Sequence, residues 1–179
     1  MAVASQRTPC SFQPAGAAQH LSCPEMPRRP VIVYRKAYRF AEPRTEMWRI
    51  LQEVDQFESW WPWLEEFRLD GGSLRTGAVL SGVVAPPVPY RMRIEVELTR
   101  IEPEHAIEAL VRGDLEGEAS LEMRDHDGGS IVEVAWTVEM MQRAMRLADR
   151  FTHPLLQWGH DRVVELTVAG FRRRLASPG

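Results

Sequence analysis

The middle of the chain alternates between apolar and polar residues, and the segment YRMRIEVEL at 90–98 does so without a fault. Residues with a period of two share one face of a strand, so Tyr90, Met92 and Ile94 lie on one side and the charged residues lie on the other. Parallel strands that are covered on both faces are instead typical of continuous apolar runs. The alternation therefore predicts an antiparallel sheet with one buried face and one solvated face.

Two further segments, 115–123 and 132–140, carry the same alternation. Between them lies DHDGG at 125–129, whose turn-forming residues predict that the two strands form a hairpin. We expect additional strands at about 31–39, 65–70, 77–84 and 105–113, with Gly71-Gly72, Pro86-Pro87 and Pro103 as breaks between them.

Helical spacing of apolar residues occurs near the two ends of this region. The segment PRTEMWRILQEV at 43–54 begins with Pro43 in the first turn and predicts one helix. We expect Asp55 to cap a short second helix that carries the tryptophan cluster of the segment ESWWPWLEEF at 58–67. The tryptophans of that segment are either a structural plug or the rim of a binding cavity.

The longest helix is predicted from about residue 142 to residue 175. We expect Pro154 to kink it or to start a fresh helix, because proline cannot donate to the helical hydrogen-bond ladder. Beyond Pro154 a stripe recurs at about 100° per residue. Its members are Leu155, Leu156, Gly159, Val163, Leu166 and Gly170.

Two glycines on the buried stripe require a reason, since each costs roughly 1 kcal/mol relative to alanine in a helix interior. Gly159 and Gly170 either let the sheet backbone approach very closely or leave volume unfilled for a ligand. Methionine and aromatic side chains suit such an adaptable apolar pocket, although they form ordinary cores more often. The candidate ligand-binding residues are Trp61, Trp63, Tyr90, Met92, Trp136, Met140, Met145, Leu156, Gly159, His160 and Val163.

The order of these elements, with the phrases WWPWL, LTRIEPEHAIEAL, SIVEVAWTVEM and LLQWGHDRVVELTVAGFRRRL, resembles the START-like (SRPBCC) superfamily and in particular its polyketide cyclase/dehydrase branch. The resemblance covers about residues 31–175. It implies an α+β, Bet v 1-like helix-grip fold, in which a curved antiparallel sheet of about seven strands wraps a long C-terminal helix. Two short helices follow the first strand, and a hydrophobic cavity lies between sheet and long helix.

The same resemblance implies that the short helices close one end of the sheet. Trp60, Trp61 and Trp63 are then expected where the cavity meets its lid. We expect at least one of them to be a structural plug, and Trp61 to touch the cavity.

His160 is the candidate for acid–base chemistry, because it borders the inward stripe and imidazole titrates near neutral pH. The alternative is a partly buried histidine that is hydrogen-bonded to a neighbour. Asp161 points about 100° away on the helix and is not assumed to orient the imidazole. Arg162 either covers the cavity mouth or is a solvated surface residue. His153 lies about 10.5 Å from His160 along the helix axis, too far to share one zinc ion.

The superfamily includes lipid carriers, quinone-binding proteins, plant pathogenesis proteins and aromatase/cyclases, so the resemblance leaves the activity open. We expect a protein that binds a hydrophobic small molecule, such as a lipid, a quinone or a polyketide-like compound. The first alternative is a cyclase or dehydratase without a metal, in which His160 and Tyr90 are catalytic. The second is a protein–protein or stress-associated module whose cavity is incidental.

Composition narrows the partners further. A length of 179 residues suffices for one domain with a sizeable core, and the net charge of −3 offers no bulk attraction for nucleic acid. No apolar run is long enough to span a bilayer, although transient membrane contact stays open. The sequence contains no HExxH, CxxC, GxSxG or glycine-rich phosphate loop, and we expect neither a metal nor a cofactor.

The first thirty residues differ from the rest, because they are rich in proline, lack a repeating apolar pattern and hold both cysteines. We expect a disordered leader at 1–30, a ligand-binding domain at 31–175 and a short tail at 176–179. The leader lacks the apolar stretch of a secretory signal. With Cys10 and Cys23 both in the leader, the folded body has no disulfide and no thiolate metal site, which suits a cytoplasmic protein.

Overall fold

The structure is a computed structural model that describes residues 31–87, 89–141 and 149–177, with the side chains of 149–157 excepted. The expected leader at 1–30, with Cys10 and Cys23, lies outside the described residues. So do residues 142–148 at the start of the predicted long helix.

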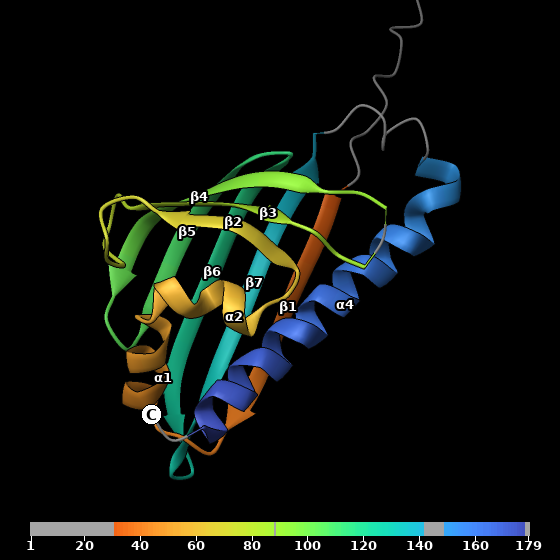
Figure 1. The fold of residues 1–179 in the computed structure, drawn as a ribbon. Coiled ribbons are helices and arrows are strands. Elements are labelled where there is room, and N and C mark those ends of the chain that lie inside the picture. Colours follow the sequence, from red (N-terminus) through yellow and green to blue (C-terminus); the bar gives the residue numbers. More distant parts are fainter. Residues whose placement is uncertain (1–30, 88, 142–148, 178–179) are drawn as a thin grey trace, which may run out of the picture.

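Seven strands form one antiparallel sheet in the order β1-β7-β6-β5-β4-β3-β2, which leaves β1 and β2 as the two edges. Figure 1 shows this sheet curving around the C-terminal helix. Each predicted strand is present, and the antiparallel pairing is confirmed. The strands are β1 (Val31–Phe40), β2 (Leu64–Leu69), β3 (Val79–Val84), β4 (Met92–Glu102), β5 (Ala106–Gly113), β6 (Leu115–His126) and β7 (Gly129–Met140).

The predicted hairpin joins β6 to β7 through a two-residue turn. His126 pairs with Gly129, and the two residues between them have positive φ angles, 49° at Asp127 and 82° at Gly128. Aspartate and glycine tolerate this left-handed region, and such a turn matches the right-handed twist of the flanking strands. The sequence DG at this position therefore sets the register of the longest strand pair in the sheet.

Two short helices and a 3-10 turn connect β1 to β2, as predicted. Helix α1 (Arg44–Leu51) starts after Pro43 and buries Met47 and Ile50. A 3-10 turn, η1 (Val54–Gln56), then leads into α2 (Phe57–Trp60). The prediction that Asp55 caps the second helix is wrong, because Asp55 lies inside η1 and the residue that precedes α2 makes no side-chain capping bond.

The C-terminal helix α4 (Asp149–Ala176) is helical without interruption on both sides of Pro154. Of the two outcomes expected at Pro154, a kink or a fresh helix, the fresh helix does not occur. A proline removes one donor from the ladder, and the hydrogen bonds of the neighbouring turns suffice to carry the helix past it. In Figure 1, α4 crosses the open side of the sheet beside β1, while α1 and α2 stand at the other side of this helix.

Buried apolar residues form three core clusters, and two of them border the candidate site. The larger cluster lies under α1 and α2 and includes Met47, Trp60 and Phe171, the last from α4. A smaller cluster contains Met92 and Met140, with Tyr90 packed against it. The candidate site lies between the sheet and α4, and residues of both clusters border it.

Candidate functional site

A cavity of about 290 Å³ lies between the inner face of the sheet, α4 and the segment that carries α1 and α2. Its size is at the lower end of the range for small-molecule pockets, about 300–1,000 Å³. Almost all of its lining is apolar. The lining residues are Tyr38, Phe40, Met47, Leu51, Trp61, Trp63, Leu121, Met123, Val132, Val134, Trp136, His160, Val163, Val164, Thr167, Val168 and Phe171.

The lining residues of α4 recur at helical spacing from His160 through Val164 and Thr167 to Phe171. This row is turned by about one residue, or 100°, from the predicted stripe. Val163 belongs to both, whereas Leu166 does not line the cavity. The inward face predicted for α4 is therefore wrong by more than a quarter of a turn.

Gly170 faces α2 instead of the cavity. A Cβ atom at this position would lie 2.4 Å from the carbonyl oxygen of Trp60 and 2.9 Å from Cδ1 of Trp61. Of the two explanations for this glycine, close backbone approach is therefore correct, but the neighbour is a short helix and not the sheet. Gly159 is buried and is not among the residues that line the cavity.

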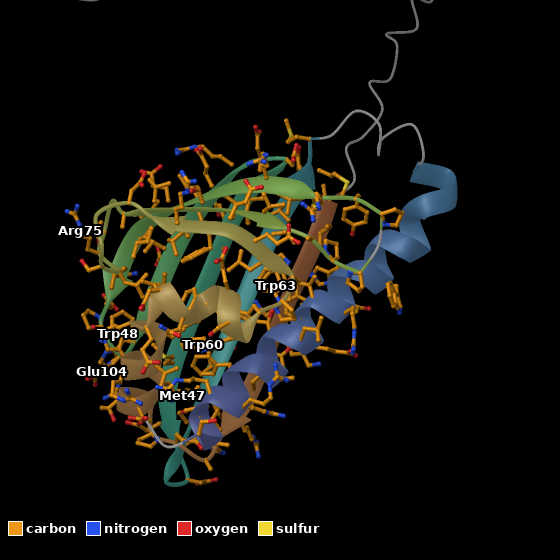
Figure 2. The ribbon with its side chains drawn as sticks, in the orientation of Figure 1. Met47, Trp48, Trp60, Trp63, Arg75 and Glu104 are labelled. Atoms are coloured by element: carbon orange, nitrogen blue, oxygen red, sulfur yellow. The ribbon has the colours of Figure 1, made fainter. Side chains whose placement is uncertain are left out.

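The tryptophan segment divides its side chains between core and cavity. Trp60 is buried in the larger core cluster, whereas Trp61 and Trp63 line the cavity with their rings stacked at 5.8 Å between centroids. Trp61 Nε1 donates a hydrogen bond to the Thr167 carbonyl oxygen on α4 at 3.0 Å. Figure 2 shows Met47, Trp48 and Trp60 beside the short helices, and Trp63 farther along toward the middle of α4.

Most polar groups around the cavity are already bonded within the protein. The Tyr38 hydroxyl is 2.5 Å from the Tyr34 hydroxyl, and Thr167 Oγ1 donates to the Val163 carbonyl oxygen at 2.7 Å. Two buried nitrogens of lining residues have no partner among the described residues, Trp63 Nε1 and His160 Nε2. An unpaired buried polar group costs about 1–3 kcal/mol, so these two atoms are where a ligand gains most from a polar contact.

His160 stands edge-on to a stacked aromatic pair. The rings of Tyr34 and Trp136 stack at 4.3 Å, and the imidazole lies 5.2 Å from the first and 5.4 Å from the second. His160 Nδ1 lies 3.2 Å from Asp161 Oδ1. Because an ionised carboxylate only accepts, Nδ1 is the donor, and Nε2 of the neutral ring is left as an acceptor. Asp161 thus does contact the imidazole, which the helical angle alone did not suggest.

Comparisons with known proteins bear on the fold. No family model and no curated protein sequence matches the chain. A protein of Thermus thermophilus matches with a TM-score of 0.64 at 15% identity, over 83% of this chain and 100% of its own. Truncated norcoclaurine synthase of Thalictrum flavum matches with a TM-score of 0.56 at 10% identity, over 84% and 97%. The di-domain ARO/CYC protein StfQ of the steffimycin biosynthetic pathway matches with a TM-score of 0.57 at 12% identity. The match covers 82% of this chain and 52% of StfQ.

The chain has the helix-grip fold. The seven-stranded antiparallel sheet, the C-terminal helix and the short helices after β1 each agree with it. At 10–15% identity the likeness establishes the fold and leaves the activity to be argued from the site.

Several predicted site residues of this helix-grip domain lie away from the cavity. Tyr90, Met92 and Met140 form the smaller core cluster and do not line it. Tyr90 is half-buried, and burial raises the pKa of its hydroxyl. Met145 lies outside the described residues, and Leu156 is described only as a backbone position in α4. Trp61, Trp63, Trp136, His160 and Val163 line the cavity.

The inward residues of β1 contribute more than sequence reasoning anticipated. Tyr38 and Phe40 line the helix-grip cavity, and Tyr34 stacks on one of its walls. These residues alternate along β1, so a period-two reading of that strand identifies them. Val134 and Val168 were also missed, although each lies on an element that was predicted.

The described part of the chain contains no group of three or more histidine, cysteine, aspartate or glutamate side chains that could hold a metal ion. Within the same residues, no helix combines the length and the apolar character that crossing a membrane requires.

Proposed function

We propose that the protein binds a hydrophobic small molecule in the cavity between α4 and the sheet. The observation that carries this proposal is the cavity itself, whose lining comes from three parts of the chain and is almost wholly apolar. Burial of apolar ligand surface contributes about 25 cal/mol per Å², so such a lining is favourable for a ring system or a single chain. A lipid, a quinone or a polyketide-like compound has this character.

An enzymatic function of the cyclase or dehydratase type is the second candidate. His160 favours it, because Nδ1 contacts a carboxylate and the buried Nε2 is without a partner in the structure. Tyr90, the proposed second catalytic group, packs in a different cluster and does not line the cavity. The cavity therefore holds His160 but not Tyr90 of the two proposed catalytic groups. This arrangement supports ligand binding more than catalysis.

A function as an interaction module, with an incidental cavity, has less support. Such a protein needs a filled interior and a sizeable exposed apolar patch. Among the described residues, the large apolar side chains that are exposed are Val31, Val33 and Trp158.

Native mass spectrometry of freshly purified protein, followed by solvent extraction, tests the binding proposal. We expect an apolar molecule to co-purify at one copy per chain. Val134→Trp and, independently, Val163→Phe place larger side chains in the cavity and should abolish its retention. Val33→Trp is the matched control, because Val33 is 71% exposed and lies outside the lining.

Circular dichroism and thermal unfolding establish that each variant is folded. Retention of the molecule by both folded cavity-filling variants would overturn the proposal. His160→Ala separates the two candidates by turnover of the extracted compound: an enzyme converts the compound and the variant loses this activity, whereas a binding protein converts none in either form.

A further inference from the structure

A second depression adjoins the cavity on its outer side. It runs between the edge strand β1 and α4, and we call it the β1–α4 groove. Tyr38, Val164 and Val168 line both the groove and the cavity. The wall between the two spaces is therefore only as thick as these side chains, and their rotation can connect the spaces.

Three cations line the β1–α4 groove: Lys36, Arg172 and Arg173. None of them forms an ion pair with a carboxylate of the described residues. Arginines on the outer face of the sheet behave differently, since Arg35 pairs with Glu133 and Arg112 with Glu97. The groove thus gathers cations whose charge the protein does not neutralise locally.

Lys36 occupies an unusual position in the sheet. By the alternation of β1 it belongs to the inward row with Tyr34 and Tyr38, and its cross-strand partner Val134 lines the cavity. Its ammonium lies 5.4 Å from the centroid of the Tyr38 ring. A lysine can cover an apolar surface with its stem while its charge reaches solvent, so the ammonium stands at the edge of the cavity.

Arg172 makes the equivalent contact from α4. Its guanidinium carbon lies 5.6 Å from the centroid of the Phe40 ring, and Phe40 also lines the cavity. Tyr38 and Phe40 are successive inward residues of β1. Each aromatic wall residue thus carries a cation against its ring, one from β1 and one from α4.

The two carboxylates of the groove do not cancel these charges. Glu165 is paired with Arg162 at 3.0 Å. Asp161 contacts His160, whose ring lies against Tyr34, so it belongs to the opposite end of the groove. Arg172 is eleven residues farther along α4, a rise of about 16 Å.

We propose that cavity and groove together bind an amphipathic anion, with its apolar body in the cavity and its acidic group between Lys36 and Arg172. This inference rests on the proposed function and narrows its ligand class. The acidic group is a carboxylate, sulfonate or phosphate, each of which pairs well with a guanidinium. A cavity of about 290 Å³ accommodates one ring system or one short chain, which excludes a phospholipid with two acyl chains.

Two dyes with the same ring system test the proposal on the full chain. 1-Anilinonaphthalene-8-sulfonate carries an anionic sulfonate, and N-phenyl-1-naphthylamine lacks it. We expect the sulfonate to bind about tenfold more tightly, and its affinity alone to fall as salt screens the groove. Both dyes should lose binding in Val134→Trp and Val163→Phe, which shows that their rings occupy the cavity.

Charge removal then locates the acidic group. Lys36→Gln and Arg172→Gln should each weaken the sulfonate by about threefold or more and leave the neutral dye within about twofold. Arg124→Gln is the matched control, because it removes one exposed cation on β6 that does not line the groove.

Each failure has a separate meaning. Equal affinities of the two dyes, or a sulfonate affinity that is insensitive to both groove variants, would overturn the anion preference and leave the binding proposal intact. If neither dye binds, both the anion preference and the binding proposal are overturned.

Discussion

Trp61 and Thr167, 106 residues apart in the sequence, are joined by a hydrogen bond from the indole Nε1 to the backbone carbonyl oxygen of α4. The neighbouring Trp63 stacks on Trp61, but its own buried Nε1 has no partner within the part of the chain that the structure describes. Two adjacent lining tryptophans therefore differ in one polar contact. Trp61 joins the segment after α2 to α4, and Trp63 leaves an N–H donor available to a ligand in the cavity.

Substitution of these two tryptophans by phenylalanine should separate the two roles. Both changes remove similar ring area, but only Trp61→Phe removes a hydrogen bond. We expect Trp61→Phe to lower the free energy of unfolding by about 1 kcal/mol more than Trp63→Phe. Urea unfolding of protein stripped of any co-purified molecule measures this difference. Equal losses would show that the bond to Thr167 contributes nothing to stability.

A second contact ties α4 to the segment after α1. Arg174 donates through Nε and Nη2 to the two carboxylate oxygens of Glu53, both at 2.8 Å, and both side chains are about four-fifths buried. Such a bidentate pair is pre-organised and partly shielded from solvent. We expect a double-mutant cycle with Glu53→Gln and Arg174→Gln to give a coupling of about 1 kcal/mol. The exposed pair Glu66 and Arg93, which contacts neither Glu53 nor Arg174, is the control and should give a smaller coupling.

The architecture was predictable from the sequence because two-residue periods and turn residues act locally. The alternation at 90–98 and the DG turn at 127–128 determine strand faces and hairpin register within a few residues. The fresh helix, one of the two outcomes expected at Pro154, does not occur, because the sequence rule for proline is also local. A single proline removes one backbone hydrogen bond from a helix, and a helix of 28 residues retains many other backbone hydrogen bonds.

The candidate site was less predictable because it depends on how α4 is rotated about its own axis. The apolar pattern of the sequence does not determine this rotation. A displacement of about 100° around α4 exchanges Leu166 and Gly170 for Thr167 and Phe171 on the inward face. Tyr90 precedes β4, which begins at Met92, and both residues belong to another cluster. Which inward residues meet around one cavity is a property of the sheet's curvature and not of its alternation.

Gly170 should resist replacement by alanine. An alanine would gain about 1 kcal/mol of helix propensity, but its Cβ would lie 2.4 Å from the Trp60 carbonyl oxygen. Forced overpacking of this kind costs about 1–3 kcal/mol, so we expect net destabilisation in chemical denaturation. Ala169→Gly on the exposed side of α4 calibrates the propensity term alone. If Gly170→Ala instead stabilises the protein by that calibrated amount, α2 and α4 are not in close contact here.

The stability of the protein should fall at alkaline pH partly through Tyr34. Burial raises the pKa of the Tyr34 hydroxyl above its ordinary value of about 10, and the hydrogen bond with Tyr38 and the negative charges of Tyr38 and Asp161 raise it further. Below about pH 10 the hydroxyl is protonated in both folded and unfolded chains, and the contribution to stability is fully present. As the pH rises beyond that value the unfolded chain loses the proton first, so the contribution declines until the folded-state pKa is reached.

Tyr34→Phe removes this titrating group and should flatten the alkaline decline in the free energy of unfolding. Tyr38→Phe removes the hydrogen bond but leaves Tyr34 buried, so it should flatten the decline less. Urea unfolding across the alkaline range, together with ultraviolet absorbance of the tyrosinate form, measures both effects. A Tyr34→Phe variant that declines as steeply as the unmodified chain would show that the Tyr34 hydroxyl is solvated and that the aromatic wall of β1 is open at this point.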